Sequence, residues 1–252
     1  MNALYDWLLD SAASAARDEP VRSLQIGLSW TLAEVADGLG FAFSPRQVPR
    51  TLGWAGTLRG QPSDRLRDWL LSWDAAQAVV GLALVNAAVN RASPCLRQAE
   101  PLRGEVPGHL RVFAHFRPRL DGQRVVVIGH YPGLERLWED FPYHCLERNP
   151  QDGDLPDSAA DYLLPQADWV FITASSLANK TLPRLLELSR QARVVLMGPS
   201  LPWLYDWRHF GVDYLAGVQV LDAEAARQVV AEGGGTRLFQ GPVEYALLAL
   251  DA

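Results

Sequence analysis

The stretch from Trp169 to Pro202 reads WVFITASSLANKTLPRLLELSRQARVVLMGPSLP. It contains two short apolar runs, Val170–Ile172 and Val194–Met197, of the kind found in strands that are covered on both faces. Between the runs, leucines recur at near-helical spacing. A strand, a helix and a second strand form a parallel crossover, and such sheets bind ligands at the carboxyl ends of their strands. The stretch therefore predicts a parallel sheet with two loops at its ligand-binding edge.

The same alternation continues on both sides of this stretch. Strands are predicted at residues 125–128, 143–146 and 214–220, and helices at 134–138, 158–164, 223–232 and 243–249. Alternating strands and helices are typical of a Rossmann-like, doubly wound α/β domain. We expect this domain to occupy residues 101–252.

The first hundred residues have a different pattern. An amphipathic helix comes first, and short strands at residues 23–29, 31–35 and 39–43 then predict an antiparallel meander. Ser63 and Asp74 are predicted to cap two helices, which extend to Trp73 and to about Asn90. Residues 1–100 are therefore predicted to form a smaller α+β domain.

Composition narrows the function classes. The net charge is −6 and the 23 Lys and Arg residues are spread along the chain, which argues against a nucleic-acid partner. Two cysteines are too few for a disulfide framework, which favours a reducing, cytoplasmic compartment. The amino terminus lacks the basic start and apolar segment of a secretory signal, and no apolar run reaches the ~20 residues of a membrane span. We expect a soluble cytoplasmic protein with no membrane partner.

The loop after the first strand of the opening stretch is rich in hydroxyl and amide groups. It carries Thr173, Ser175, Ser176 and Asn179 close to the start of a helix. Hydroxyl, amide and backbone donors at a helix start can together hold a carboxylate or a phosphate. The alternative is that Ser175 or Ser176 only caps the helix. Gly198, Pro199 and Ser200 follow the second strand and would complete the rim of the site.

The segment after residue 128 also lies at a predicted strand end. Gly129 and Gly133 bracket a turn, but the glycine spacing of the dinucleotide fingerprint is absent, so an ordinary NAD-dependent enzyme is not expected. One interpretation is that Gly129 and His130 line a pocket. The alternative is that the glycine is needed only for the turn and that His130 is half exposed. Glu147 ends the next strand, a position that grips ribose or another polyol in such folds.

One short segment carries three types of metal ligand. His144, Cys145 and Glu147 lie within four positions of one another, although on a strand His144 would point away from the other two. His144 and Cys145 are weak metal candidates, because three local ligands of mixed type do not close a site. The alternative is a strand end with a buried cysteine and a solvated acid.

Several motifs in order resemble a known family, the putative heavy-metal-chelation family of unknown function. They are GLSWTLAEVADGLGFAFSP, GLALVNAAVN, VVVIGHYPGLERL, ITASSLANKTLPRLLEL, VVLMGPSLP, FGVDYLAGVQVLDAE and EGGG. The resemblance implies an enolase-amino-terminal-like domain paired with a Rossmann-like domain, and a ligand site in the cleft between them. By position, that site would draw on Thr31, Asn86, Gly129, Glu147, Thr173, Ser175, Asn179, Gly198, Pro199, Ser200 and Gly234.

Three hypotheses of function follow. The first is binding of a small anionic metabolite or metal chelate in the cleft, with a role in heavy-metal or metallocofactor homeostasis, and with a transition metal or metal chelate as the implied cofactor. The second is a transferase or lyase that holds a nucleotide-like cofactor over Gly129 and Glu147. The third is a non-catalytic assembly or scaffold subunit, suggested by nine tryptophans and the long loop around Trp54. The sequence leaves open whether the protein is an enzyme and whether it forms a homo-oligomer.

Overall fold

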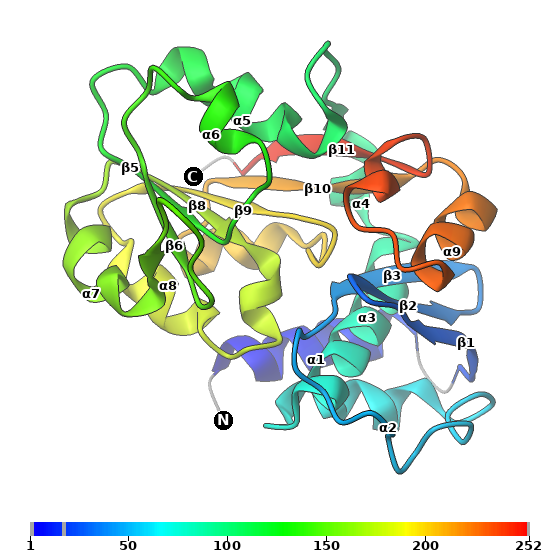
Figure 1. Cartoon of the computed structure of the whole chain (residues 1–252). Coiled ribbons are helices and arrows are strands. Elements are labelled where there is room, and N and C mark those ends of the chain that lie inside the picture. The colour runs from blue at the N-terminus through cyan, green and yellow to red at the C-terminus, as the bar shows by residue number, and fades with distance from the viewer. Residues whose placement is uncertain (1–2, 17–18, 251–252) are drawn as a thin grey trace.

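We analysed a computed structural model of the chain, which describes residues 3–16 and 19–250. Figure 1 shows a large sheet with helices on both faces and a smaller sheet, drawn in blue, to one side of it. None of the helices in the described ranges has the length and hydropathy needed to cross a membrane.

The larger sheet has eight strands in the order β4-β11-β10-β9-β8-β5-β6-β7. They are β4 (Glu100–Pro101), β5 (Val125–Ile128), β6 (His144–Glu147), β7 (Leu155–Pro156), β8 (Trp169–Thr173), β9 (Arg193–Met197), β10 (Tyr214–Val220) and β11 (Val243–Ala249). From β10 to β7 every neighbouring pair is parallel, whereas β11 and β4 are antiparallel additions at one edge. The chain runs outward from β5 through β6 to β7 and then resumes at β8, so the strand order reverses between β5 and β8. This topology confirms the predicted doubly wound α/β sheet and places its switch point at the ends of β5 and β8.

Helices cover both faces of this sheet because neighbouring strand residues point to opposite sides. In β8, Phe171 packs in one core with α5 (Arg111–Phe116), α6 (Leu134–Leu137) and α9 (Ala223–Ala231). Val170 and Ile172 pack in another core with α7 (Ala160–Leu163) and α8 (Leu182–Leu188). The uninterrupted apolar run of β8 in the sequence thus reflects burial on both faces.

The smaller sheet is the predicted meander. Its strands β1 (Val21–Ile26), β2 (Trp30–Val35) and β3 (Gly38–Phe43) pair antiparallel in chain order. Helix α3 (Ala75–Asn90) lies against it, and a Cβ atom on Gly40 would come within 2.2 Å of the Ala83 carbonyl oxygen. Glycine at position 40 therefore lets the helix backbone approach the sheet.

Three more helices complete the first part of the chain. They are α1 (Ala3–Ala15), α2 (Ser63–Arg67) and α4 (Pro94–Gln98). Helix α1 also reaches the larger sheet's side of the molecule, where the Tyr5 hydroxyl donates to the Leu177 carbonyl at 2.9 Å. The predicted domain boundary after residue 100 falls within β4, and it stays a prediction.

The structure corrects three local predictions. The helix predicted at residues 243–249 is wrong: this segment is β11, which pairs along its whole length with β10. Its Ala and Leu residues favour helix locally, but the open edge of β10 offers a full ladder of hydrogen bonds. The helix predicted from Ser63 to Trp73 is a short α-helix followed by a 3₁₀ turn that ends at Leu71.

The third correction concerns a helix cap. Ser63 is not the cap of α2 but its first residue, after Pro62, and its buried hydroxyl has no hydrogen-bond partner among the described residues. By contrast, the Asp74 carboxylate accepts from the Gln77 backbone N–H, which confirms the predicted cap of α3.

Candidate functional site

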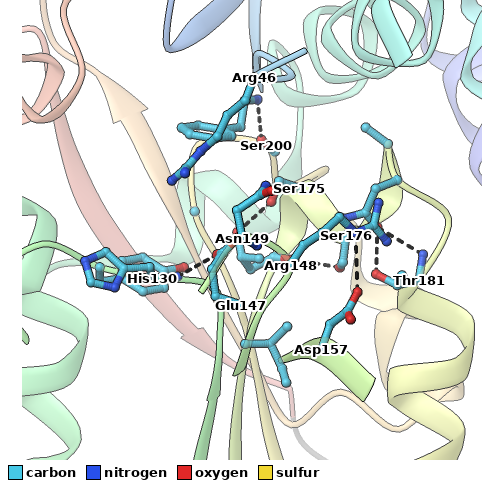
Figure 2. Close-up of a pocket in the computed structure, with 18 of the residues that line it drawn as sticks. Arg46, His130, Glu147, Arg148, Asn149, Asp157, Ser175, Ser176, Thr181 and Ser200 are labelled. Atoms are coloured by element: carbon cyan, nitrogen blue, oxygen red, sulfur yellow. Dashed lines mark hydrogen bonds and ion pairs between the residues drawn. The ribbon is translucent and has the colours of Figure 1, made fainter. Parts of the chain in front are cut away.

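A cavity of about 860 Å³ lies between the two sheets, at the carboxyl ends of β5, β6, β8 and β9. The first part of the chain contributes one wall through the start of β2, the end of β3 with the segment that follows it, and the start of α3. The loops of the larger sheet contribute the other. In Figure 2, Arg46 reaches the cavity from the side opposite Glu147.

The structure brings together ten of the thirteen residues predicted to bind ligand. They all line the cavity: Gly129, His130, Glu147, Thr173, Ser175, Ser176, Asn179, Gly198, Pro199 and Ser200. They come together because parallel strands end at the same edge of a sheet, so loops far apart in sequence meet there.

Gly129 occupies the switch point. Its φ angle is +102°, and a Cβ atom there would come within 3.0 Å of Thr173 Cγ2 on the neighbouring strand. Its N–H donates to the Leu146 carbonyl at 2.9 Å, which extends the pairing of β5 and β6 by one residue. Glycine is required here both by the left-handed backbone and by the close approach of the two strand ends.

Glu147 at the end of β6 is held by backbone donors. One carboxylate oxygen accepts from His130 N at 3.0 Å and the other from Asn149 N at 3.1 Å. Each oxygen retains capacity for another donor. The carboxylate is thus fixed in place beside the switch point, where a hydroxyl group of a ligand could donate to it.

The hydroxyl-rich loop is organised by its own side chains. The Thr173 and Ser175 hydroxyl oxygens lie 3.0 Å apart, and the Ser176 hydroxyl donates to the Thr173 carbonyl at 2.7 Å. A 3₁₀ turn begins at Ala174, whereas α8 begins only at Leu182, beyond Asn179. Asn179 Oδ1 accepts from the Thr181 N–H at 3.1 Å. The hydrogen-bond donors that this loop offers are therefore hydroxyl groups, and not the backbone N–H groups at the start of a long helix.

Three arginines line the cavity, together with the carboxylates of Glu147, Asp157 and Asp161. Arg148 lies 3.4 Å from Asp157, and Arg184 is paired with Asp161, so two of the cavity's arginines are already compensated. Arg46 is exposed on the segment after β3 and has no ion-pair partner within the described part of the chain. Sequence reasoning missed these three arginines, because an arginine in a loop is ordinarily a solvated surface residue.

Two hydrogen bonds tie the walls together. Phe43 N donates to the Ser200 hydroxyl at 3.0 Å, and Trp30 Nε1 donates to the Gly235 carbonyl at 3.0 Å. Both link residues more than 150 positions apart in the chain. Trp30 also stands edge-on to Phe43, with ring centroids 5.2 Å apart. The first wall is therefore positioned by contacts with the second.

Three residues predicted to bind ligand do not line the cavity. Thr31 is buried and its hydroxyl lies 3.0 Å from that of Ser44, which does line it. Asn86 is buried in α3 and donates to the Phe41 carbonyl at 2.7 Å. Gly234 packs against Val229, and its neighbour Gly235 lines the cavity instead. Thr31 therefore contacts a cavity residue from behind, whereas Asn86 and Gly234 contact residues outside the lining.

The weak metal candidates separate in the structure. His144 is exposed at the start of β6, whereas Cys145 is buried and lies near His130 and Asp154. His130 Nδ1 lies 3.0 Å from an Asp154 carboxylate oxygen, and the Cys145 thiol donates to the Gly129 carbonyl at 3.5 Å. Sequence reasoning missed Asp154, since its position depends on the turn at residues 151–154, which a hydrogen bond from Asp154 N to the Gln151 carbonyl closes.

Burial and hydrogen bonding set the protonation of Cys145 and Asp154. Burial, together with the nearby Asp154 and Glu147 carboxylates, raises the pKa of the Cys145 thiol, so it is protonated at neutral pH. Burial also opposes ionisation of Asp154, but the nearby Cys145 thiol, the hydrogen bond from Gln151 N and the contact with His130 outweigh it and lower the pKa of that carboxyl. The cluster thus pairs a thiol with a carboxylate and an imidazole.

These features define a class of protein: a Rossmann-like sheet and a small α+β unit that enclose a cavity at the switch point. The chain belongs to the family described as "Putative heavy-metal chelation", whose two profiles match residues 111–249 and residues 9–89. The membership agrees with the resemblance in the sequence motifs.

Solved structures and one curated protein are similar to this chain. A protein of unknown function from Desulfitobacterium hafniense, of the DUF364 family, is 29% identical, with a TM-score of 0.83 over 98% of this chain and 97% of the other. A DUF364-family protein from Pyrococcus horikoshii, also of unknown function, is 21% identical and has a TM-score of 0.78 over 98% and 99% of the two chains. An uncharacterised protein of Methanocaldococcus jannaschii is 34% identical over 110 residues, which is 41% of this chain and 42% of that protein.

Proposed function

We propose that the protein binds a small anionic metabolite or an anionic metal chelate in the cavity between its two sheets, in the service of heavy-metal or metallocofactor homeostasis. The observation that carries the proposal is the set of groups on the two walls of the cavity. It combines the uncompensated charge of Arg46 with the hydroxyl groups of Thr173 and Ser175. The family description supports the link to metals.

Size and charge both favour such a ligand. A volume of about 860 Å³ suits a metabolite-sized molecule, because ligand pockets measure roughly 300–1,000 Å³. The Arg148 and Arg184 side chains are held by acids, so Arg46 is the cation most able to pair with an incoming carboxylate or oxyanion. A charge-assisted hydrogen bond from a guanidinium is worth about 1.5–3 kcal/mol.

The test is direct binding by calorimetry and thermal shift. The probes are citrate, molybdate, phosphate and metal citrates, and we expect at least one to bind and to stabilise the protein by mass action. Arg46→Ala should weaken that binding by about tenfold or more, since it removes one charge-assisted contact. Arg50→Ala is the matched control, because Arg50 is exposed on the same segment but does not line the cavity. Failure of every anion to bind, or equal effects of the two variants, would refute the proposal.

A second candidate rests on Glu147. It ends the second strand of the doubly wound sheet, 18 residues after Gly129, where dinucleotide-binding folds hold a ribose hydroxyl. This favours a transferase or lyase with a nucleotide-like cofactor. The segment after β5 offers no long helix for a pyrophosphate, since α6 spans only Leu134–Leu137. The anion proposal therefore takes precedence.

The substitution Glu147→Gln distinguishes the two candidate functions. If a nucleoside binds over Gly129, Glu147→Gln should weaken adenosine, AMP and S-adenosyl compounds while leaving citrate and molybdate unaffected. Unchanged affinity for every adenosine compound would remove the second candidate. We expect the variant to fold, because the carbonyl oxygen of the new amide can still accept one of the two backbone hydrogen bonds. Circular dichroism checks this.

A further inference from the structure

The cluster of His130, Cys145 and Asp154 brings three metal-binding side chains to one point from three segments of the larger sheet's edge. The imidazole, thiol and carboxylate ligand atoms all lie within 4.8 Å of one another. His130 comes from the segment after β5, Cys145 from within β6, and Asp154 from just before β7. Because β5, β6 and β7 are neighbours in the sheet, the strand order itself holds the three together.

The three side chains are positioned before any ion binds. Asp154 is held by its bond from Gln151 N at 2.9 Å and faces His130 Nδ1 at 3.0 and 3.3 Å from its two oxygens. The Asp154 side chain is only 5% exposed, whereas that of His130 is 21% exposed. Each group loses hydration on burial, and hydrogen bonds from Gln151 N and His130 offset this loss at Asp154.

The distances suit a small ion. Zinc binds nitrogen and oxygen at about 2.0–2.2 Å and sulfur at about 2.3 Å, which places tetrahedral ligand atoms roughly 3.3–3.7 Å apart. The farthest pair in the cluster would need to close by only ~1 Å. Sulfur and imidazole select Zn²⁺, Cd²⁺ and similar cations over Mg²⁺ and Ca²⁺, which prefer oxygen.

We infer that His130, Cys145 and Asp154 form a three-ligand site for a thiophilic divalent cation of the Zn²⁺ and Cd²⁺ class, with the fourth position left to water or to a ligand. His130 belongs both to this site and to the wall of the cavity, so the site lies at the cavity's edge. The inference does not rest on the proposed function, since here protein side chains bind the bare cation.

Binding has a definite proton balance. The Cys145 thiol must lose its proton to become a thiolate ligand, and that proton passes to the buffer. Because the Asp154 carboxylate accepts, His130 Nδ1 carries a proton in the metal-free cluster. To bind the cation through Nδ1, the neutral ring exchanges this proton through solvent for one on Nε2, so the imidazole releases no net proton. Asp154 is already ionised. Uptake of one cation should therefore release about one proton at neutral pH.

The experiment is titration of metal-free, reduced protein with Zn²⁺, Cd²⁺ and Co²⁺ in the absence of other chelators. We expect one equivalent to bind, with release of about one proton, a rise in unfolding temperature and, for Co²⁺, a thiolate-to-cobalt charge-transfer band. Cys145→Ser should abolish the band and weaken Zn²⁺ binding by more than about 100-fold, since loss of even an outer-shell partner costs 10–100-fold. His130→Gln and Asp154→Asn should weaken it in the same direction.

Two control variants match the site residues. Cys95→Ser replaces the other buried cysteine, and His144→Gln replaces the exposed histidine that precedes Cys145. Both should bind Zn²⁺ as the unchanged protein does. Absence of binding in the unchanged protein, or Zn²⁺ binding that survives Cys145→Ser, would overturn the inference. If Cys145→Ser fails to fold, His130→Gln decides the matter, because His130 is partly exposed.

The outcomes also separate this site from the anion proposal. Cys145→Ser should leave citrate and molybdate binding intact, and Arg46→Ala should leave Zn²⁺ binding intact. If the unchanged protein binds no anion, the anion proposal is refuted and the metal site is not. If it binds no Zn²⁺, the metal site is refuted and the anion proposal is not.

Discussion

The two walls of the cavity are built on different principles. On the wall from the larger sheet, polar groups are fixed by near neighbours, as the Thr173 and Ser175 hydroxyls and the contact of Glu147 with Asn149 N illustrate. On the wall from the first part of the chain, Trp30 and Phe43 are fixed by hydrogen bonds to the other wall. One wall is organised mainly by contacts between near neighbours, whereas the other depends in addition on hydrogen bonds across the cavity. Substitutions on the second kind of wall should therefore cost more stability.

Trp30→Ala should have the largest effect. Trp30 is 8% exposed, packs edge-on against Phe43 and donates across the cavity to Gly235. We expect a loss of about 3–4 kcal/mol in the free energy of unfolding, together with loss of ligand binding. Trp30→Phe removes only the hydrogen bond and should cost about 1 kcal/mol. Chemical denaturation measures both, and an effect as small as that of Trp73→Ala, at a residue 82% exposed, would contradict the role of this wall.

Gly129→Ala should come second. The added methyl group faces both an unfavourable left-handed backbone and Thr173 Cγ2 at 3.0 Å, so we expect a cost of roughly 2 kcal/mol. Gly122→Ala is the matched control: its φ angle is +75°, but the new Cβ would meet no described atom within 4 Å. Equal unfolding free energies for the two variants would show that the contact with Thr173 does not constrain the switch point.

Ser200→Ala compared with Ser175→Ala addresses the two walls most directly. Ser200 is buried and accepts from Phe43 N across the cavity, so its loss leaves a backbone N–H without that partner and should cost about 1 kcal/mol. Ser175 bonds to a neighbouring hydroxyl that can turn to water, so its loss should cost less than about 0.5 kcal/mol. Urea unfolding measures the loss of unfolding free energy in each variant. A larger loss for Ser175→Ala than for Ser200→Ala would contradict the proposed difference between the two walls.

The smallest effect on stability is expected at Asp168, which precedes β8 at the end of the strand away from the cavity. Hydrogen bonds from Arg124 hold the pKa of Asp168 at about 2, below its ordinary value. Since the folded-state pKa is lowered, the pair stabilises the protein above the ordinary pKa of about 4, and this stability is lost as the pH falls through about 2. The stability difference between Asp168→Asn and the unchanged protein should therefore shrink from pH 5 to about pH 2. Asp140→Asn, at an exposed position, should show a difference near zero throughout.

Much of the fold, and the polar residues on the larger sheet's wall of the cavity, could be predicted because they follow from local patterns. The apolar runs at Val125–Ile128 and Val170–Ile172 identify strands, and parallel strands bring Gly129 and Thr173 to one edge. The absence of the glycine fingerprint likewise argues against an ordinary nicotinamide site from the sequence alone. The position of Asp74 before an apolar helix was enough to locate the start of α3.

Only the tertiary structure decided which distant residues meet. Val243–Ala249 became a strand because β10 had an open edge, which no local pattern of these residues records. Arg46 entered the cavity because Phe43 is anchored to Ser200, 157 residues away. Asp154 reached Cys145 and His130 through a turn and the order of β5, β6 and β7. Local spacing determines which face a residue occupies, but contacts between segments depend on chain paths that periodicity does not encode.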